Sequence, residues 1–151
     1  MSNKQLIRQP LKNLGHHEKI NIHWSFWVVC IVALIWNVMG CINFTMQMNR
    51  EMLASYPEAA RSLIEGRPLW VTVTFAIAVF GGAFGDILLL CKKSVSFYLF
   101  IASFLGVLVT NAHTFTVTSS TDIWVGSLMS LMVSAFLIWY SKRVERKGWI
   151  N

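Results

Sequence analysis

Polar side chains inside long apolar runs are the residues of this sequence whose types could do chemistry. One run holds Asn37 and Asn43, and another holds Asn111 and His113. At a rise of 1.5 Å per residue, Asn37 lies about 20 Å, and Asn111 and His113 about 24 to 27 Å, from the inner ends of their runs. Buried polar groups in a membrane are costly and need partners. We therefore predict one polar zone in the outer third, either as interhelical hydrogen bonds or as an outward-facing ligand pocket.

Asp86 is the acidic residue that interrupts an apolar run, and we place it at the inner mouth of the bundle. Lys92 and Lys93 follow it by about a turn and a half, so an interfacial salt bridge is one interpretation. The alternative is a carboxylate that couples proton or ion movement to a pathway. A midplane carboxylate would favour coupling more strongly, and the sequence has none.

No motif of a known catalytic class is present. The sequence lacks a GxSxG, an HExxH, a Walker loop and a pair of carboxylates. His16, His17 and Glu18, with His23, have the composition of a metal site, but such spacing is common, and we predict no metal ligand there. The three cysteines, Cys30, Cys41 and Cys91, have no CxxC spacing and are interpreted as structural thiols. We therefore predict no catalytic residue and a chain that is not an enzyme, and we identify no cofactor.

Four apolar runs must position these side chains. Each is close to the roughly 20 helical residues that cross a bilayer core, and the chain is 55% hydrophobic and only 13% charged. We predict an all-α polytopic membrane protein, a bundle of four transmembrane helices. The predicted domains are a basic N-terminal segment (1–23), the transmembrane domain 24–140 with spans 24–44, 68–90, 95–117 and 123–140, and a basic tail (141–151).

The basic residues predict the orientation of the bundle. Of the 13 Lys and Arg residues, the loops on one side hold only Arg50, Arg61 and Arg67, where three glutamates offset them. The others flank the opposite ends of the spans, as at a cytoplasmic membrane surface. We predict that both termini are cytoplasmic, in the bacterial inner membrane. Because these charges border apolar runs, the net charge of +6 indicates contact with the lipid bilayer and not with nucleic acid.

The first outer loop, 45–67, is long enough to contain a short amphipathic helix. Ser55 and Glu58 have the spacing of a capping box, and Gly66 would end the helix. This helix either lies on the outer membrane surface or covers an outward-facing pocket as a lid.

Small residues at four-residue spacing predict close helix packing. They are Gly81 and Gly85 in the second span, Ala102 and Gly106 in the third, and Gly126 and Ser130 in the fourth. In lipid, such faces let helix backbones approach. They pack either within one bundle or between the copies of a homo-oligomer.

Several short motifs give the chain a family resemblance. It resembles a group of small four-span bacterial inner-membrane proteins that are loosely labelled sugar transporters and look similar to DoxX-like proteins. The motifs are a Trp-Asn-x-x-Gly at Trp36–Gly40, an outer loop at Met46–Glu51, a Pro-x-Trp at Pro68–Trp70 and the run Ala78–Gly82. The resemblance covers roughly residues 26–115 and implies fold and location, without an established activity.

The chain departs from that group at two positions. The resemblance leads us to expect an acidic residue where Asn43 stands and a small neutral residue where Asp86 stands. Any acid-dependent activity of the outer pocket is therefore not expected in this chain.

Three functions remain open. The leading one is a non-enzymatic bundle that binds or carries a small polar or amphipathic molecule through its outer pocket. As a carrier it would need a homodimer, because four helices hardly form an alternating-access pathway alone. The second is a structural or regulatory subunit that docks other membrane proteins. The third is a DoxX-like membrane protein that acts on a quinone or a redox partner.

Overall fold

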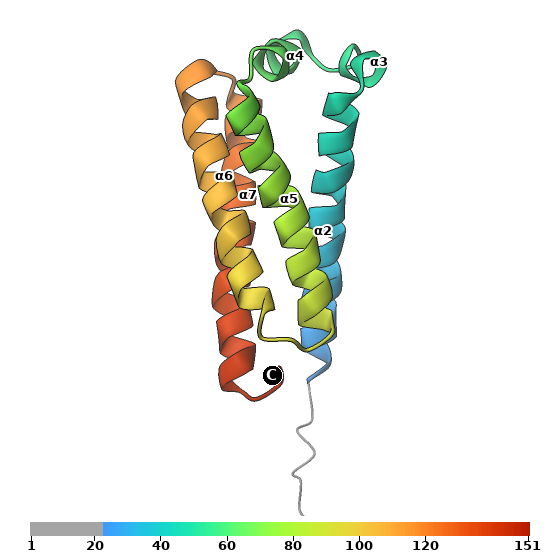
Figure 1. The fold of residues 1–151 in the computed structure, drawn as a ribbon, viewed down its shortest axis with the longest axis vertical. Coiled ribbons are helices and arrows are strands. Elements are labelled where there is room, and N and C mark those ends of the chain that lie inside the picture. The colour runs from blue at the N-terminus through green and yellow to red at the C-terminus, as the bar shows by residue number, and fades with distance from the viewer. Residues whose placement is uncertain (1–22) are drawn as a thin grey trace, which may run out of the picture.

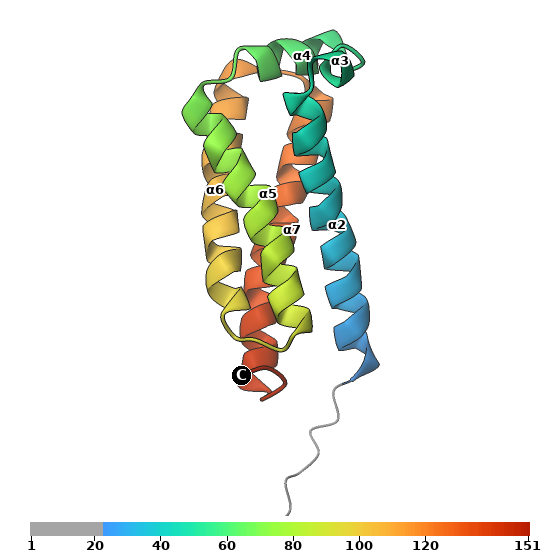
Figure 2. The same ribbon diagram turned by 45° about the vertical axis from the view of Figure 1, so that its right-hand side comes forward.

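The computed structural model describes residues 23–151, and over this range the chain is helical and contains no strand. Four of its helices are long and apolar enough to cross a membrane, which confirms the predicted class (Figures 1 and 2). These four are α2 (Trp24–Met48), α5 (Leu69–Leu90), α6 (Ser96–Val117) and α7 (Thr121–Arg146). Two short helices, α3 (Arg50–Leu53) and α4 (Glu58–Glu65), lie in the loop between α2 and α5.

Two of the spans are longer than the apolar runs predicted. α2 continues beyond residue 44 to Met48, and the Thr45 hydroxyl donates to the Cys41 carbonyl inside this extension. α7 continues beyond residue 140 to Arg146, and its last turn carries Arg143 and Arg146. Cations favour the carbonyl end of a helix, so the charges that end the apolar run do not end the helix.

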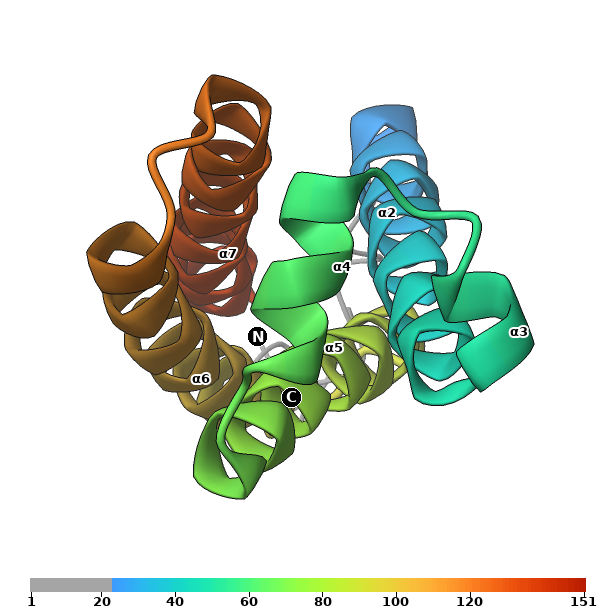
Figure 3. The same cartoon turned by 90° about the horizontal axis from the view of Figure 1, so that it is seen from above.

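The four long helices pack in series around one side of the bundle. α2 packs on α5, α5 on α6, and α6 on α7. Seen from above, α2 and α7 lie on opposite sides and α4 crosses between them (Figure 3). The bundle is therefore an incomplete ring whose first and last members flank an interior space.

Glycines set the close contact between α5 and α6. A Cβ on Gly85 would come within 2.7 Å of the Phe100 ring, and one on Gly106 within 2.7 Å of the Thr74 carbonyl. A Cβ on Gly81 would make ordinary contacts with Ser103 at 3.6 Å. These faces pack inside the chain, as one of the two interpretations of the sequence predicted.

The apolar core lies at the end of the bundle where α2 begins and α7 ends. Phe26 and Cys30 of α2 meet Leu89 of α5 and Leu137 of α7 there, all at most 2% exposed. The C-terminal residues complete this core, because the backbone of Asn151 exchanges hydrogen bonds with the turn between α5 and α6. We call this the closed end; the other end, beneath α4, is the α4 end.

The loop helix α4 begins differently from the capping box that the sequence predicts. Pro57 stands at its N-terminus, and no side chain caps it. The Ser55 hydroxyl donates instead to the Met52 carbonyl at 2.6 Å. Proline has no side-chain acceptor, so the first amides of α4 receive no side-chain cap.

Candidate functional site: a cavity beneath α4

A cavity of about 480 Å³ lies between the long helices, and this volume falls in the usual range of small-molecule sites. Its walls come from α2, α5, α6 and α7, and α4 contributes Ala60, Leu63 and Ile64. The core seals the closed end, so the cavity occupies the part of the bundle nearer α4. α4 thus borders the cavity at the end away from the core.

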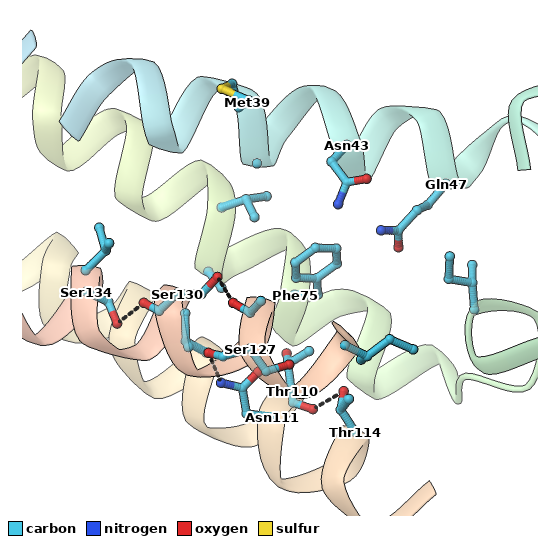
Figure 4. Close-up of a pocket in the computed structure, with 18 of the residues that line it drawn as sticks. Met39, Asn43, Gln47, Phe75, Thr110, Asn111, Thr114, Ser127, Ser130 and Ser134 are labelled. Atoms are coloured by element: carbon cyan, nitrogen blue, oxygen red, sulfur yellow. Dashed lines mark hydrogen bonds between the residues drawn. The ribbon is translucent and has the colours of Figure 1, made fainter. Parts of the chain in front are cut away.

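Two amides project into the cavity from the α2 wall. Asn43 and Gln47 are one helical turn apart and extend toward the opposite wall (Figure 4). The hydroxyl of Tyr56, just before α4, donates to the Asn43 carbonyl oxygen at 2.6 Å. Arg67 donates from Nη2 to the Gln47 carbonyl oxygen at 3.0 Å. Both ends of the α4 segment are thereby bonded to α2.

The opposite wall is formed by Asn111 of α6 and the small-residue face of α7. Asn111 is 7% exposed and donates to the Ser127 carbonyl of α7 at 2.9 Å. The hydroxyl of Ser130 donates to the Gly126 carbonyl of its own helix, at 3.1 Å. A Cβ on Gly126 would meet no atom within 4 Å. The small residues of α7 therefore leave room for the cavity, and Asn111 of α6 reaches their helix through the Ser127 carbonyl.

Asn37 of the cavity wall and the buried Asp86 behind it form a hydrogen-bonded pair. Asn37 lines the cavity, and its amide nitrogen donates to Oδ2 of Asp86 at 2.7 Å. Asp86 is fully buried, and its Oδ1 has no hydrogen-bond partner among residues 23–151. Gly82 makes the pair fit, because a Cβ there would collide with the Asn37 amide.

This pair corrects two expectations for Asp86. We expected Asn37 in the outer third and Asp86 at the opposite end, yet they are hydrogen-bonded. An ion pair with Lys92 or Lys93 was one of the two interpretations of Asp86; within residues 23–151 the ion pair found joins Lys142 to Glu145. Lys92 lies instead over the Trp27 ring, 5.7 Å from its centroid.

The four amide and imidazole residues predicted to share a zone are only partly brought together. Asn37, Asn43 and Asn111 all line the cavity, whereas His113 does not. The His113 ring lies edge-on to Trp70, with centroids 5.7 Å apart. One helical position separates His113 from the cavity-facing Thr114, and depth counting along the sequence does not resolve that difference.

The sequence interpretation missed Arg67, the charged residue of the cavity lining. Its guanidinium lies over the Phe75 ring, 5.2 Å from the centroid, and its Nη1 is buried without a hydrogen-bond partner in the described chain. Burial lowers the pKa of Arg67, but arginine stays protonated in proteins. The sequence did contain a signal for Arg67. It stands directly before the second span on the side that has few basic residues, where the charge bias disfavours an arginine.

The polar groups of the cavity are amides, hydroxyls and one guanidinium. Among residues 23–151, no cluster of three His, Cys, Asp or Glu side chains could hold a metal ion. The candidates His16, His17 and Glu18 lie outside the described residues. The arrangement can instead bind a molecule through amides, hydroxyls and one cation, with apolar side chains around the rest.

Comparisons with protein-family models, with curated proteins and with solved structures find no match. The resemblance to four-span bacterial inner-membrane proteins therefore stays a prediction from the sequence. The cavity itself is what bears on function.

Proposed function

We propose that this chain is a non-enzymatic membrane protein that binds or carries a small amphipathic molecule in the cavity beneath α4. The observation that carries the proposal is the cavity of about 480 Å³, whose lining combines polar groups beneath α4 with apolar side chains from all four long helices. Asn43, Gln47 and Arg67 supply the polar end, and Val79 and Val107 belong to the apolar walls. Such a division suits a ligand with a polar head and an apolar body.

The proposed orientation puts α4 outside a bacterial inner membrane and both termini in the cytoplasm. The closed end carries Lys92 and Lys93, together with the basic residues of 142–147. At the α4 end, Arg50, Arg61 and Arg67 are matched by three glutamates. This distribution supports the orientation through the positive-inside rule, and the cavity would then face outward.

Part of the small-residue pattern behind the docking-subunit and homo-oligomer interpretations is used within the chain. Gly85 and Gly106 lie in the contact between α5 and α6, the small residues of α7 border the cavity, and Ala102 of α6 is exposed. Ligand binding is the function that the geometry favours.

A neutral fluorescent amphiphile, 1-aminoanthracene, tests the proposal in phosphatidylcholine nanodiscs, with empty nanodiscs as the reference. Wild-type protein is expected to bind it saturably. Ser130→Phe places a ring in the cavity and should abolish saturable binding. The fold should tolerate the loss of the hydroxyl, because that hydroxyl bonds only within its own helix. Ala135→Phe is the matched control, since Ala135 is exposed on α7 and does not line the cavity.

Two results would contradict the proposed function. One is a wild-type protein that binds no dye above the empty nanodisc. The other is equal binding by Ser130→Phe and Ala135→Phe, which would place the dye elsewhere on the protein.

A further inference from the structure

Arg67 is a half-buried cation that has no acidic partner among residues 23–151. The ion pair found within residues 23–151 lies between Lys142 and Glu145, and Arg67 is bonded only to a neutral amide, that of Gln47. Nη2 makes that bond, and Nη1 is buried and unpaired. A buried unpaired charge is costly unless a counter-charge offsets it. The guanidinium therefore has both the charge and the free donor that an anion would satisfy.

The neighbouring amides also present donors. Asn43 and Gln47 each accept a hydrogen bond through the carbonyl oxygen, from Tyr56 and Arg67 respectively. Their NH₂ groups make no hydrogen bond within the described chain, and the Asn43 nitrogen points into the cavity (Figure 4). The polar end thus offers one guanidinium and two NH₂ groups. A donor set of this kind matches a carboxylate or phosphate, whose oxygens only accept.

The remainder of the cavity is suited to an apolar chain. Phe75 lies beneath the guanidinium, and Val79, Val107 and Val133 line the walls from three helices. The hydroxyls of Ser130 and Ser134 are already bonded within α7, so they demand no polar partner from a ligand. A free inorganic anion would leave this apolar volume unfilled.

We infer that the cavity takes an amphipathic anion, with a carboxylate or phosphate head on Arg67, Asn43 and Gln47 and an apolar body between α2 and α7. This inference rests on the proposed function and names its ligand class. Arg67 fixes the head, and the cavity walls accommodate the chain.

Displacement of 1-aminoanthracene at pH 8 from the protein in phosphatidylcholine nanodiscs tests the inference. The competitors are laurate, dodecyl phosphate, 1-dodecanol and inorganic phosphate. Laurate and dodecyl phosphate should each displace the dye at a concentration about tenfold below that of 1-dodecanol, as expected for charged hydrogen bonds. Inorganic phosphate should not displace it, because it lacks the apolar body.

Variants locate the head group. Arg67→Gln should still bind the dye but lose the preference for laurate over 1-dodecanol, whereas Arg67→Lys should keep part of it. Arg61→Gln is the control, because it removes a positive charge from α4 at a position that does not line the cavity. If Arg67→Gln does not fold, Asn43→Leu removes one donor from an exposed position and should lower the preference several-fold.

The outcomes separate the two proposals. A wild-type protein that binds no dye refutes the proposed function and the inference with it. Dye binding with equal displacement by laurate and 1-dodecanol, or an unchanged preference in Arg67→Gln, refutes the inference alone. Displacement by inorganic phosphate as effective as by laurate would also overturn it, because the head alone would then be recognised.

Discussion

Replacing Gly82 by alanine tests the hydrogen-bonded pair of Asn37 and Asp86. The new Cβ would occupy the space of the Asn37 amide, so that amide must move away from the Asp86 carboxyl. Asp86 is fully buried and already has one unpaired oxygen, so losing its partner leaves the whole carboxyl unsatisfied. An unsatisfied buried group costs about 1–3 kcal/mol. Alanine in place of glycine returns about 0.5–1 kcal/mol in a helix, so Gly82→Ala should lower the free energy of unfolding by about 1–2 kcal/mol.

Gly81→Ala is the matched control, one position earlier on the same helix. Its Cβ would meet Ser103 and Leu99 at 3.6 to 3.7 Å, which is ordinary contact. This variant should therefore be as stable as the wild type, or more stable by about 0.5–1 kcal/mol. Reversible unfolding by sodium dodecyl sulfate in mixed micelles measures the two values under the same conditions.

A second substitution identifies the cause of the loss. In an Asn37→Ala background the amide is already absent, so Gly82→Ala should no longer destabilise the protein. The double-mutant cycle should give a coupling energy of about 1–2 kcal/mol between the two positions. Equal stability of Gly82→Ala and Gly81→Ala, or additive effects of Gly82→Ala and Asn37→Ala, would refute the reasoning.

The remaining predictions concern orientation and the lid. A cysteine placed at Ser62 in α4 should react with a membrane-impermeant reagent added outside intact cells. A reporter fused after Asn151 should be active only in the cytoplasm. Labelling of residue 62 only after lysis would reverse the orientation. Tyr56→Phe removes the hydrogen bond to Asn43 and should speed dissociation of 1-aminoanthracene a few-fold in stopped-flow, by a loss of about 0.5–1.5 kcal/mol. An unchanged dissociation rate would show that the α4 segment does not retain the ligand.

The sequence predicts the helices well because long apolar runs have few stable structures in a membrane. All four spans are present, with α5 and α6 starting and ending within one residue of the prediction. The ends of α2 and α7 were less accurate, since a helix can continue past its apolar run where caps and charges suit it.

The site is less predictable because it depends on how the helices pack and on which face each turns toward its neighbours. Counting residues from each helix end places Asn37 and Asp86 at different depths. The packing of α2 on α5 nevertheless brings Nδ2 of Asn37 within 2.7 Å of Oδ2 of Asp86. Counting also treated His113 and Asn111 alike, although they lie on different faces of α6. Arg67 escaped notice because a charge outside the apolar runs looks like a loop residue until the structure shows what surrounds it.

The apolar core holds α2 and α7 together at the closed end, while both helices line the cavity farther along. A change of helix tilt at the core therefore moves the cavity wall. Leu137 belongs to the core, and Ile123 lines the cavity 14 residues earlier on the same helix. That separation is about 21 Å, so a tilt of α7 by about 5° about Leu137 moves the cavity wall at Ile123 by about 2 Å. If a methyl group added or removed near Leu137 tilts α7, the displacement is larger at Ile123 than at Leu137. Substitutions in the apolar core are therefore expected to alter the cavity without changing any residue that lines it.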